Sequence, residues 1–286
     1  MEEWIIISIG LLVSSVALYL VVRKSNNVEM SVDIQNLGMF LLPTIFIGLY
    51  ILFKNESLEI SIINLLIIIF AAIFFSWLGN IASLKALKKA PNPGYSLVIS
   101  KSYVLMTSIV SVWIFHSPLT LKSIIAIVLI IIFSAVIIID RKKLSDISNN
   151  IWIWFTVGAF FAWGFLALTL KYLTSNGMKS VVILFYLMLF VSILVLSQII
   201  FKKVKIIVTK EQKFIFLFIG IASTFFNLFN ILGYQYAPNP GYINAVNAGS
   251  IALVTIFAAI FFRDDLSIKK IIGVLGVVAS LVLLFI

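Results

Sequence analysis

One hexapeptide, Ala-Pro-Asn-Pro-Gly-Tyr, occurs twice in this chain, as Ala90–Tyr95 and again as Ala237–Tyr242. The two copies lie 147 residues apart, and identical residues continue at this offset on both sides of them. The matched pairs are Ser76 and Ser223, Asn80 and Asn227, Phe115 and Phe262, Leu119 and Leu266, and Lys122 and Lys269. Self-similarity at about half the chain length indicates a duplicated unit and not a solenoid. The sequence therefore predicts two halves with the same fold.

Each hexapeptide predicts the end of one helix and the start of the next. Proline lacks the backbone N–H and pushes the residue before it out of the α region, so two prolines this close cannot continue a helix. Asn92 and Asn239 are placed to act as N-caps, each followed by a proline at the first helical position, where the missing N–H costs nothing. We expect a structural role for both copies and assume no contact with a ligand.

The composition excludes a water-soluble domain. Of the 286 residues, 62% are hydrophobic and only 11% are charged, and the mean hydropathy is +1.18. A helix that crosses the hydrocarbon core needs about 20 apolar residues, which leaves room for roughly ten crossings. Cysteine is absent, so disulfides and thiol chemistry are excluded. The first residues do not resemble a cleavable signal peptide, and we expect the first apolar run to be retained.

Ten apolar runs divide into two sets of five. The first half is predicted to comprise residues 1–140, the second half residues 151–286, and a polar link of residues 141–150 joins them. The predicted fold is an all-α membrane protein of ten transmembrane helices, arranged as two inverted five-helix repeats, because an odd number of spans turns the second half upside down. Spans 1 to 10 are expected at Trp4–Val22, Leu37–Phe53, Ile62–Leu84, Gly94–Phe115, Leu121–Ile139, Ile151–Leu173, Ser180–Phe201, Phe214–Tyr236, Gly241–Phe262 and Ile268–Ile286.

Lysine and arginine are distributed unevenly between the two sets of loops. Sixteen lie in or beside the loops that follow odd-numbered spans, and four, Lys54, Lys122, Lys171 and Lys179, lie on the opposite side. Because cytoplasmic loops are enriched in these residues, we expect the odd-numbered loops in the cytoplasm and both termini outside, in the cell (inner) membrane. The net charge of +10 is explained by this orientation, and no nucleic-acid partner is expected.

Polar side chains recur at helical spacing inside four spans. In span 3, Ser76, Asn80 and Ser83 fall on one helix face. Polar residues inside a membrane face the bundle interior or a wet cavity. Spans 4, 8 and 9 carry corresponding stripes, and the four spans together are predicted to enclose one compartment. The candidate substrate-binding residues on these stripes are Asn80, Ser83, Ser100, Tyr103, Asn227, Asn230, Tyr234, Asn247 and Ser250. The alternative is that these groups only bond one helix to another.

Two further residues are candidates for the same site. Lys101 is the one cation well inside an apolar run, although a continuous helix would place it about 120° from the stripe of span 4. It either contacts a ligand or extends its ammonium group toward the cytoplasmic surface. Trp163 of span 6 either lines the compartment or packs against span 7. Gly276 and Ser280 in span 10 form a small-xxx-small pair that suggests a homodimer.

The residues that enzymes and metal sites require are missing from the spans. All carboxylates lie at span edges, and one histidine without cysteine forms neither a metal cluster nor a nucleophile–base pair. No glycine-rich phosphate loop with Walker spacing occurs. We therefore predict that the protein is not an enzyme and has no catalytic residue, metal site or cofactor.

The stretch from Ala237 to Ile286 resembles the C-terminal half of an EamA repeat in the drug/metabolite transporter superfamily. The resemblance rests on the hexapeptide, on Asn247-Ala248-Gly249-Ser250, on Phe262–Ser267, and on Gly273 before an apolar finish. Where that family often has Gly-Glu, this chain has Arg263-Asp264-Asp265. The resemblance implies a ten-helix transporter of metabolites or drugs. Many members are thought to keep their termini in the cytoplasm, which is opposite to the charge distribution found here.

The leading hypothesis is a secondary transporter of a small polar or amino-acid-like metabolite, which works by alternating access at a central site between spans 3, 4, 8 and 9. Its expected partners are the small-molecule solute and membrane lipid. One alternative is an exporter of lipophilic cations or drugs, against which the missing mid-span acid counts. Another is a scaffold or lipid-handling membrane protein that transports nothing, in which the polar stripes would serve packing.

Overall fold

The computed structural model describes residues 2–90, 93–139, 151–204, 209–264 and 266–286, and it shows no strand among them. The predicted link of residues 141–150, and Asn92 as an N-cap, lie outside the described residues. The helices are α1 (Glu3–Asn27), α2 (Val32–Lys54), α3 (Ile62–Phe70), the π-helix η1 (Ala71–Trp77), α4 (Leu78–Lys89), α5 (Pro93–Lys101), α6 (Tyr103–Phe115), α7 (Leu121–Ile138), α8 (Ile151–Ser175), α9 (Ser180–Phe201), α10 (Lys210–Tyr236), α11 (Pro240–Phe262) and α12 (Ile268–Phe285).

These helices form ten membrane spans, as the sequence predicts. Ten segments are long and apolar enough to cross a bilayer. Span 3 consists of α3, η1 and α4, and span 4 consists of α5 and α6. Large apolar side chains such as Phe53, Trp113 and Phe201 are at least 80% exposed, which is stable against lipid and unfavourable in water.

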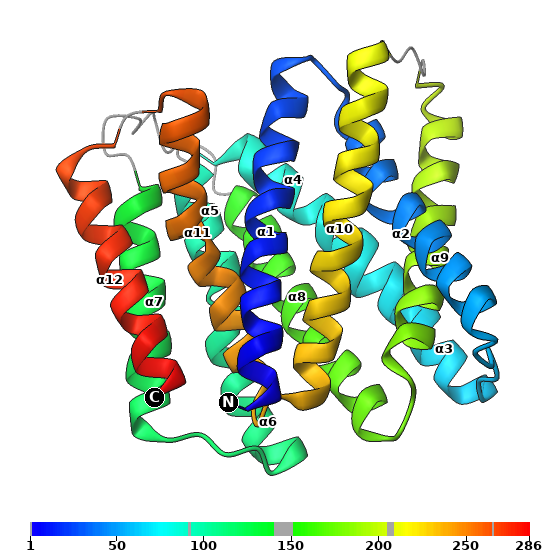
Figure 1. Ribbon diagram of the computed structural model, residues 1–286, viewed down its shortest axis with the longest axis horizontal. Helices are drawn as coiled ribbons and strands as arrows, with labels where there is room; N and C mark the ends of the chain where they lie inside the picture. The colour runs from blue at the N-terminus through cyan, green and yellow to red at the C-terminus, as the bar shows by residue number, and fades with distance from the viewer. Residues whose placement is uncertain (1, 91–92, 140–150, 205–208, 265) are drawn as a thin grey trace.

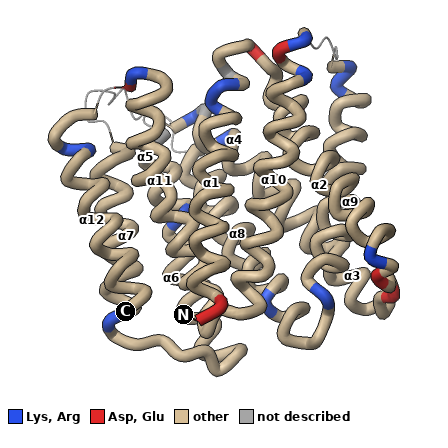
Figure 2. The backbone as a smooth tube through the Cα atoms, in the orientation of Figure 1, with Lys and Arg blue, Asp and Glu red and all other residues tan. Residues whose placement is uncertain are grey.

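Both chain termini lie on one side of the helix bundle (Figure 1). We call this the termini side, and we call the opposite side, where α7 ends and α8 begins, the linker side. The odd-numbered spans end on the linker side and the even-numbered spans begin there, so α1 and α8, the first spans of the two halves, run in opposite directions (Figure 1). Figure 2 shows that Lys and Arg gather mainly on the linker side. This is the arrangement that an inverted repeat requires.

The duplication is visible in the backbone. Every described residue with a positive φ has a partner in the other half: Glu29 with Gly177, Asn55 with Lys203, and His116 with Arg263. Helix lengths also correspond between the halves, since α1 and α8 have 25 residues each and α7 and α12 have 18 each. A left-handed backbone is uncommon outside glycine, so the shared positions indicate that both halves adopt one fold.

The two halves differ by one residue, which the π-helix η1 accommodates. The first two positive-φ pairs lie 148 residues apart, and the third pair lies 147 apart. The change falls within span 3, where α3, η1 and α4 contribute 9, 7 and 12 residues, against 27 in the corresponding α10. A π-bulge is how a helix absorbs one inserted residue, and such bulges are frequent at functional sites. The π-helix includes Ser76, the first residue of the polar stripe.

Helix contacts are repeated with their partners exchanged between the halves. Helix α1 packs on α10 and α8 packs on α4, while α2 packs on α9 and α7 packs on α12. The α7–α12 contact uses small residues, because a Cβ on Gly276 would lie 2.3 Å from the Phe133 ring. Ser280 is also buried and bonds the carbonyl of Gly276. The predicted small-xxx-small pair therefore packs inside its own chain, and a homodimer stays a prediction that this motif does not support.

The second hexapeptide begins α11 as expected. Asn239 is extended, its side chain accepts a hydrogen bond from the Gly241 backbone N–H at 2.8 Å, and Pro240 occupies the first turn. The Asn239 side chain also donates to the carbonyl of Ser108, at 3.1 Å. Gly241 is required there, because a Cβ would lie 1.8 Å from Ser108 Oγ. The turn thus fixes α11 closely against α6.

Candidate functional site

A cavity of about 360 Å³ lies in the middle of the bundle, and we call it the central cavity. Eight of the ten spans line it; only the spans formed by α7 and α12 do not. Its volume is within the range of small-molecule sites. Its polar lining residues are Ser76, Asn80, Ser83, Ser100, Lys101, Tyr103, Ser223, Asn227, Asn230, Tyr234, Asn244 and Asn247.

The structure brings ten of the eleven predicted site residues around this one cavity. They are Asn80, Ser83, Ser100, Lys101, Tyr103, Trp163, Asn227, Asn230, Tyr234 and Asn247. Ser250 is not among the lining residues: it is fully buried and accepts a hydrogen bond from Ser15 Oγ at 2.9 Å. Ser250 lies one turn beyond Asn247 on α11, where the same helix face meets α1 and no longer meets the cavity.

The duplicated asparagines contribute one amide each to the cavity wall. Asn80 Nδ2 on α4 donates to Asn36 Oδ1 on α2, at 3.2 Å. Asn227 Nδ2 on α10 donates to the carbonyl and the hydroxyl of Ser223. In each asparagine the side-chain nitrogen therefore donates to an acceptor within the protein. The two Oδ1 atoms have no partner in the described part of the chain, and they can accept hydrogen bonds from a solute.

Lys101 lines the cavity because span 4 is interrupted next to it. Helix α5 ends at Lys101 and α6 begins at Tyr103, and Ser102 between them has a ψ of −5°. The projection that separates Lys101 from the polar stripe assumes a continuous helix, so it does not hold across Ser102. The Lys101 ammonium lies 5.3 Å from the ring centroid of Tyr19 on α1, a cation–π distance.

Toward the termini side, hydrogen bonds around Asn244 connect helices of the cavity wall. Tyr234 donates to Asn244 Oδ1 at 2.6 Å, and Asn244 Nδ2 donates to Thr107 Oγ1 at 3.0 Å. Tyr103 adds a longer bond of 3.4 Å to the same oxygen. We call these four residues the Asn244 cluster. Thr107 and Tyr103 belong to the first half of the chain and the other two to the second, so the cluster joins the halves. The exposed fractions of Asn244 and Thr107 are 1% and 0%.

Toward the linker side, the same positions carry leucines. Leu87 is the counterpart of Tyr234 and Leu97 is the counterpart of Asn244 in the first copy, and both line the cavity without forming a side-chain hydrogen bond. The hexapeptides differ in the same way. Ala237 and Tyr242 of the second copy are buried, whereas Ala90 and Tyr95 of the first are only half-buried. The conformation is therefore tighter on the termini side than on the linker side.

Apolar side chains from four other spans complete the wall, and the sequence reasoning missed most of them. They come from α1, α2, α8 and α9, and Trp163 is the one that was predicted. The others from these helices are Leu18, Tyr19, Val22, Met39, Phe40, Leu166, Ala167, Leu170, Leu184, Leu187 and Met188. An apolar residue that faces a cavity has the same sequence signature as one that faces lipid, so no pattern distinguished them. The polar half and the apolar half together suit an amphipathic solute.

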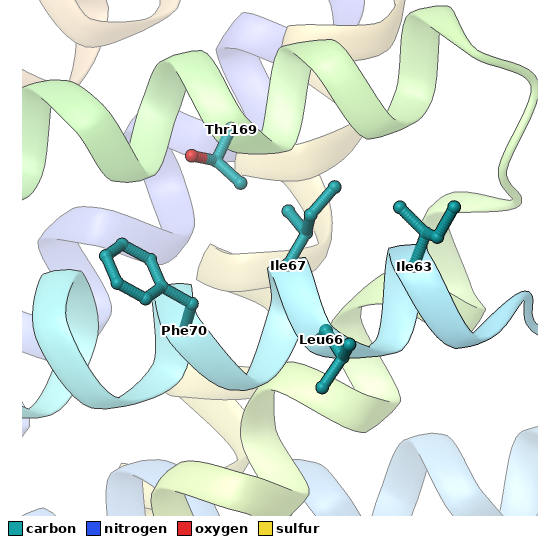
Figure 3. A pocket seen from close by; sticks show the side chains of 5 residues that line it. All are labelled: Ile63, Leu66, Ile67, Phe70 and Thr169. Atoms are coloured by element: carbon teal, nitrogen blue, oxygen red, sulfur yellow. The ribbon is translucent and has the colours of Figure 1, made fainter.

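A second hollow, of about 320 Å³, lies between α3 and α8 (Figure 3). Its lining residues are Ile63, Leu66, Ile67, Phe70 and Thr169. Ile63, Leu66 and Phe70 are each more than half exposed. This hollow is a groove in the lipid-facing surface and holds none of the predicted site residues.

The described lining of the central cavity consists of amides, hydroxyls, one ammonium group and apolar side chains. Its lining among the described residues includes no Asp, Glu, His or Cys. No group of three or more metal-binding side chains occurs in the described part of the chain. What the cavity offers is a set of hydrogen-bonding groups, one ammonium group and an apolar wall, which is the chemistry of reversible binding.

Comparisons with known proteins relate the second half of the chain to one family and its fold to solved structures. The model of the EamA-like transporter family matches residues 150–286. No curated protein sequence matches the chain significantly. Among the solved structures that are similar, one titled "Crystal structure of protein" superposes with a TM-score of 0.81 at 11% sequence identity, covering 99% of this chain and 97% of that one; at this identity the likeness concerns the fold alone. The second half of the chain, residues 150–286, is therefore similar to the EamA-like transporter family, and the ten apolar spans make the chain a multi-pass membrane protein.

Proposed function

We propose that the chain is a secondary transporter that moves a small polar or amino-acid-like solute by alternating access, and that the solute binds in the central cavity between spans 3, 4, 8 and 9. The observation that carries this proposal is the convergence of matched residues from both halves on one cavity, above all Asn80 and Asn227. Packing alone does not require two equivalent amides on the wall of one cavity, since buried polar groups in a membrane are costly.

The unequal closure of the two sides supports the alternating-access step. In a duplicated transporter the two halves exchange environments when the cavity changes its open side. In this conformation the Asn244 cluster closes the termini side. On the linker side the corresponding residues are Leu87 and Leu97, whose side chains form no hydrogen bond. We propose that the opposite state separates Thr107 from Asn244 and brings the leucines together. Because leucines form no hydrogen bond, the closed linker side depends on apolar contact alone.

The orientation that we propose follows from the positively charged linker side. Arg23 at the end of α1 forms a bidentate ion pair with Asp264 there, and Lys202 pairs with Asp33. After these pairs are formed, an excess of lysine and arginine still remains on that side. By the positive-inside rule the linker side is cytoplasmic and both termini are outside. Labelling of a cysteine introduced between residues 140 and 150 tests this: access for an impermeant reagent from outside the cell would reverse it.

Export of lipophilic cations is a weaker alternative. It requires an acidic group to offset the charge of the cargo, and no carboxylate lines the cavity among the described residues. A scaffold or lipid-handling function would leave the central cavity without a purpose. Neither alternative has a specific observation in its favour.

Flux through proteoliposomes tests the proposal. The purified chain is reconstituted, and exchange of a panel of radiolabelled amino acids and small organic acids is measured. We expect exchange of at least one panel member, and we expect Asn80→Ala and Asn227→Ala to abolish it while the protein remains folded. Asn176→Ala is the matched control, because Asn176 is exposed outside the cavity. Unchanged exchange in both cavity variants would remove the site assignment, and no exchange by the unmodified protein would reject the transporter function.

A further inference from the structure

The central cavity holds a positive charge that no carboxylate among the described residues pairs with. Lys101 is half-buried, and its ammonium group contacts the face of the Tyr19 ring. The four ion pairs among the described residues involve Arg23, Lys24, Lys179 and Lys202, and none involves Lys101. A cation at membrane depth is costly unless a counter-charge or water accompanies it. A negatively charged solute would supply that counter-charge.

A neutral donor near Lys101 also suits a carboxylate. Tyr103 lines the same space, and its hydroxyl forms only a long bond of 3.4 Å, to Asn244 Oδ1. A carboxylate accepts several hydrogen bonds at once, and a charge-assisted bond from an ammonium group is stronger than a neutral one. One ammonium group balances one negative charge, whereas a phosphate carries close to two at neutral pH. The charge balance therefore favours a monoanion.

The remaining wall suits the rest of such a molecule. Trp163, Phe226 and Met188 are among the side chains that form an apolar surface in the cavity. The Oδ1 atom of Asn230 lies in the same wall, is buried, and has no hydrogen-bond partner in the described part of the chain. It is an acceptor for an amine, amide or hydroxyl group. The volume of about 360 Å³ accommodates a molecule of the size of an amino acid or a small aromatic acid.

We propose that the solute of the central cavity is an organic monocarboxylate and that the Lys101 ammonium group binds its carboxylate. The inference rests on the proposed function only in taking the cavity as the solute site. The competing explanation is that Lys101 extends along Tyr19 toward the linker side and contacts no solute. The two explanations differ in one consequence: only binding by Lys101 makes discrimination between a carboxylic acid and the amide of the same shape depend on the charge of that side chain.

Paired acids and amides test this on the full-length purified protein. The probes are 3-phenylpropanoate with 3-phenylpropanamide, and 4-methylpentanoate with 4-methylpentanamide, titrated while the thermal unfolding temperature is measured. A ligand that binds only the folded state raises that temperature in a saturable way. We expect at least one acid to stabilise the unmodified protein and its amide to do so far less. Equal stabilisation by acid and amide, or no stabilisation by either acid, would overturn the inference without any variant being made.

Substitutions assign the effect to Lys101. Lys101→Met keeps the length of the side chain and removes the charge, and we expect it to weaken acid binding about 10- to 100-fold, the loss of one charge-assisted hydrogen bond. Lys101→Arg should restore acid binding. Lys122→Met is the matched control, because Lys122 is exposed at the start of α7 on the termini side. If Lys101→Met does not fold, Lys101→Gln replaces it. Acid binding by a neutral variant at the unmodified affinity would overturn the inference.

These experiments can reject the transporter function and the role of Lys101 independently of each other. If the unmodified protein binds the acid through Lys101 but exchanges nothing in proteoliposomes, the transporter function is rejected and the carboxylate site stands. If the protein exchanges acid and amide at equal rates, transport stands and the role of Lys101 is rejected.

Discussion

Replacing Thr107 by valine should open the termini side of the central cavity. Thr107 Oγ1 accepts the bond from Asn244 Nδ2, at 3.0 Å, that joins the first half of the chain to the second. Valine has nearly the same shape but no acceptor, and valine is what the second half carries at the matched position, Val254. The substitution therefore removes the bond without creating a cavity.

The size of the effect follows from the burial of the partner. Asn244 is 1% exposed while the termini side is closed. Leaving a buried donor unpaired costs about 1–3 kcal/mol. In the open state water can reach Asn244, so the cost falls on the closed state alone. The closed-to-open ratio should fall by about 5- to 150-fold, since a ligand or mutation shifts an equilibrium by the difference in its energy between the states.

Cysteine labelling measures this ratio directly, because the chain contains no cysteine. The reporter is Ala248→Cys, in the cavity wall, and a membrane-impermeant maleimide is added from the termini side. We expect the labelling rate to rise with the open population in Thr107→Val. Thr255→Val is the matched control, because Thr255 bonds only the Ile251 carbonyl of its own helix. The reasoning is refuted if Thr107→Val labels no faster than the parent, or if Thr255→Val accelerates labelling equally.

Two further predictions concern contacts outside the cavity. Gly241→Ala should lower the unfolding temperature in detergent, because the new methyl group would lie 1.8 Å from Ser108 Oγ and overpacking costs about 1–3 kcal/mol. Gly158→Ala is the control and should be close to neutral, because its methyl group would have its nearest neighbour at 3.9 Å. Equal losses of stability in the two variants would contradict the role of the Ser108 contact. Arg23→Gln should lower stability by no more than about 1 kcal/mol, because the ion pair with Asp264 is partly exposed. That difference should disappear in 1 M salt, measured by the same unfolding assay, and a larger loss independent of salt would show that the charge is not its cause.

Much of the fold was predictable because membrane spans and sequence repeats leave strong signals. Ten apolar runs and the repeated hexapeptide suffice for ten helices in two similar halves. The polar stripes of spans 3, 4, 8 and 9 were predictable as well, since a polar residue at helical spacing inside a membrane must avoid lipid. The roles that we assign to these residues in solute binding stay predictions until flux or binding is measured.

The rest depended on geometry that residue spacing does not contain. The interruption at Ser102 brings Lys101 into the cavity although the ideal helix points it elsewhere. Ser250 shares a helix face with Asn247 but meets Ser15 on α1. The π-helix at Ala71–Trp77 accommodates one extra residue in the first half. The sequence did not reveal it, because few residues before Ser76 are identical in the two halves. In each case a neighbouring helix or a local break in helix geometry decided the outcome.

Access to the two duplicated asparagines tests the central claim most directly. Single cysteines replace Asn80 or Asn227, and a membrane-impermeant maleimide is added to sealed vesicles from one side and then from the other. If both residues share one cavity that opens to each side in turn, each cysteine is labelled from both sides, more slowly from the termini side that the Asn244 cluster closes. Labelling of the two cysteines from opposite sides only, or of neither from any aqueous side, would contradict a shared cavity.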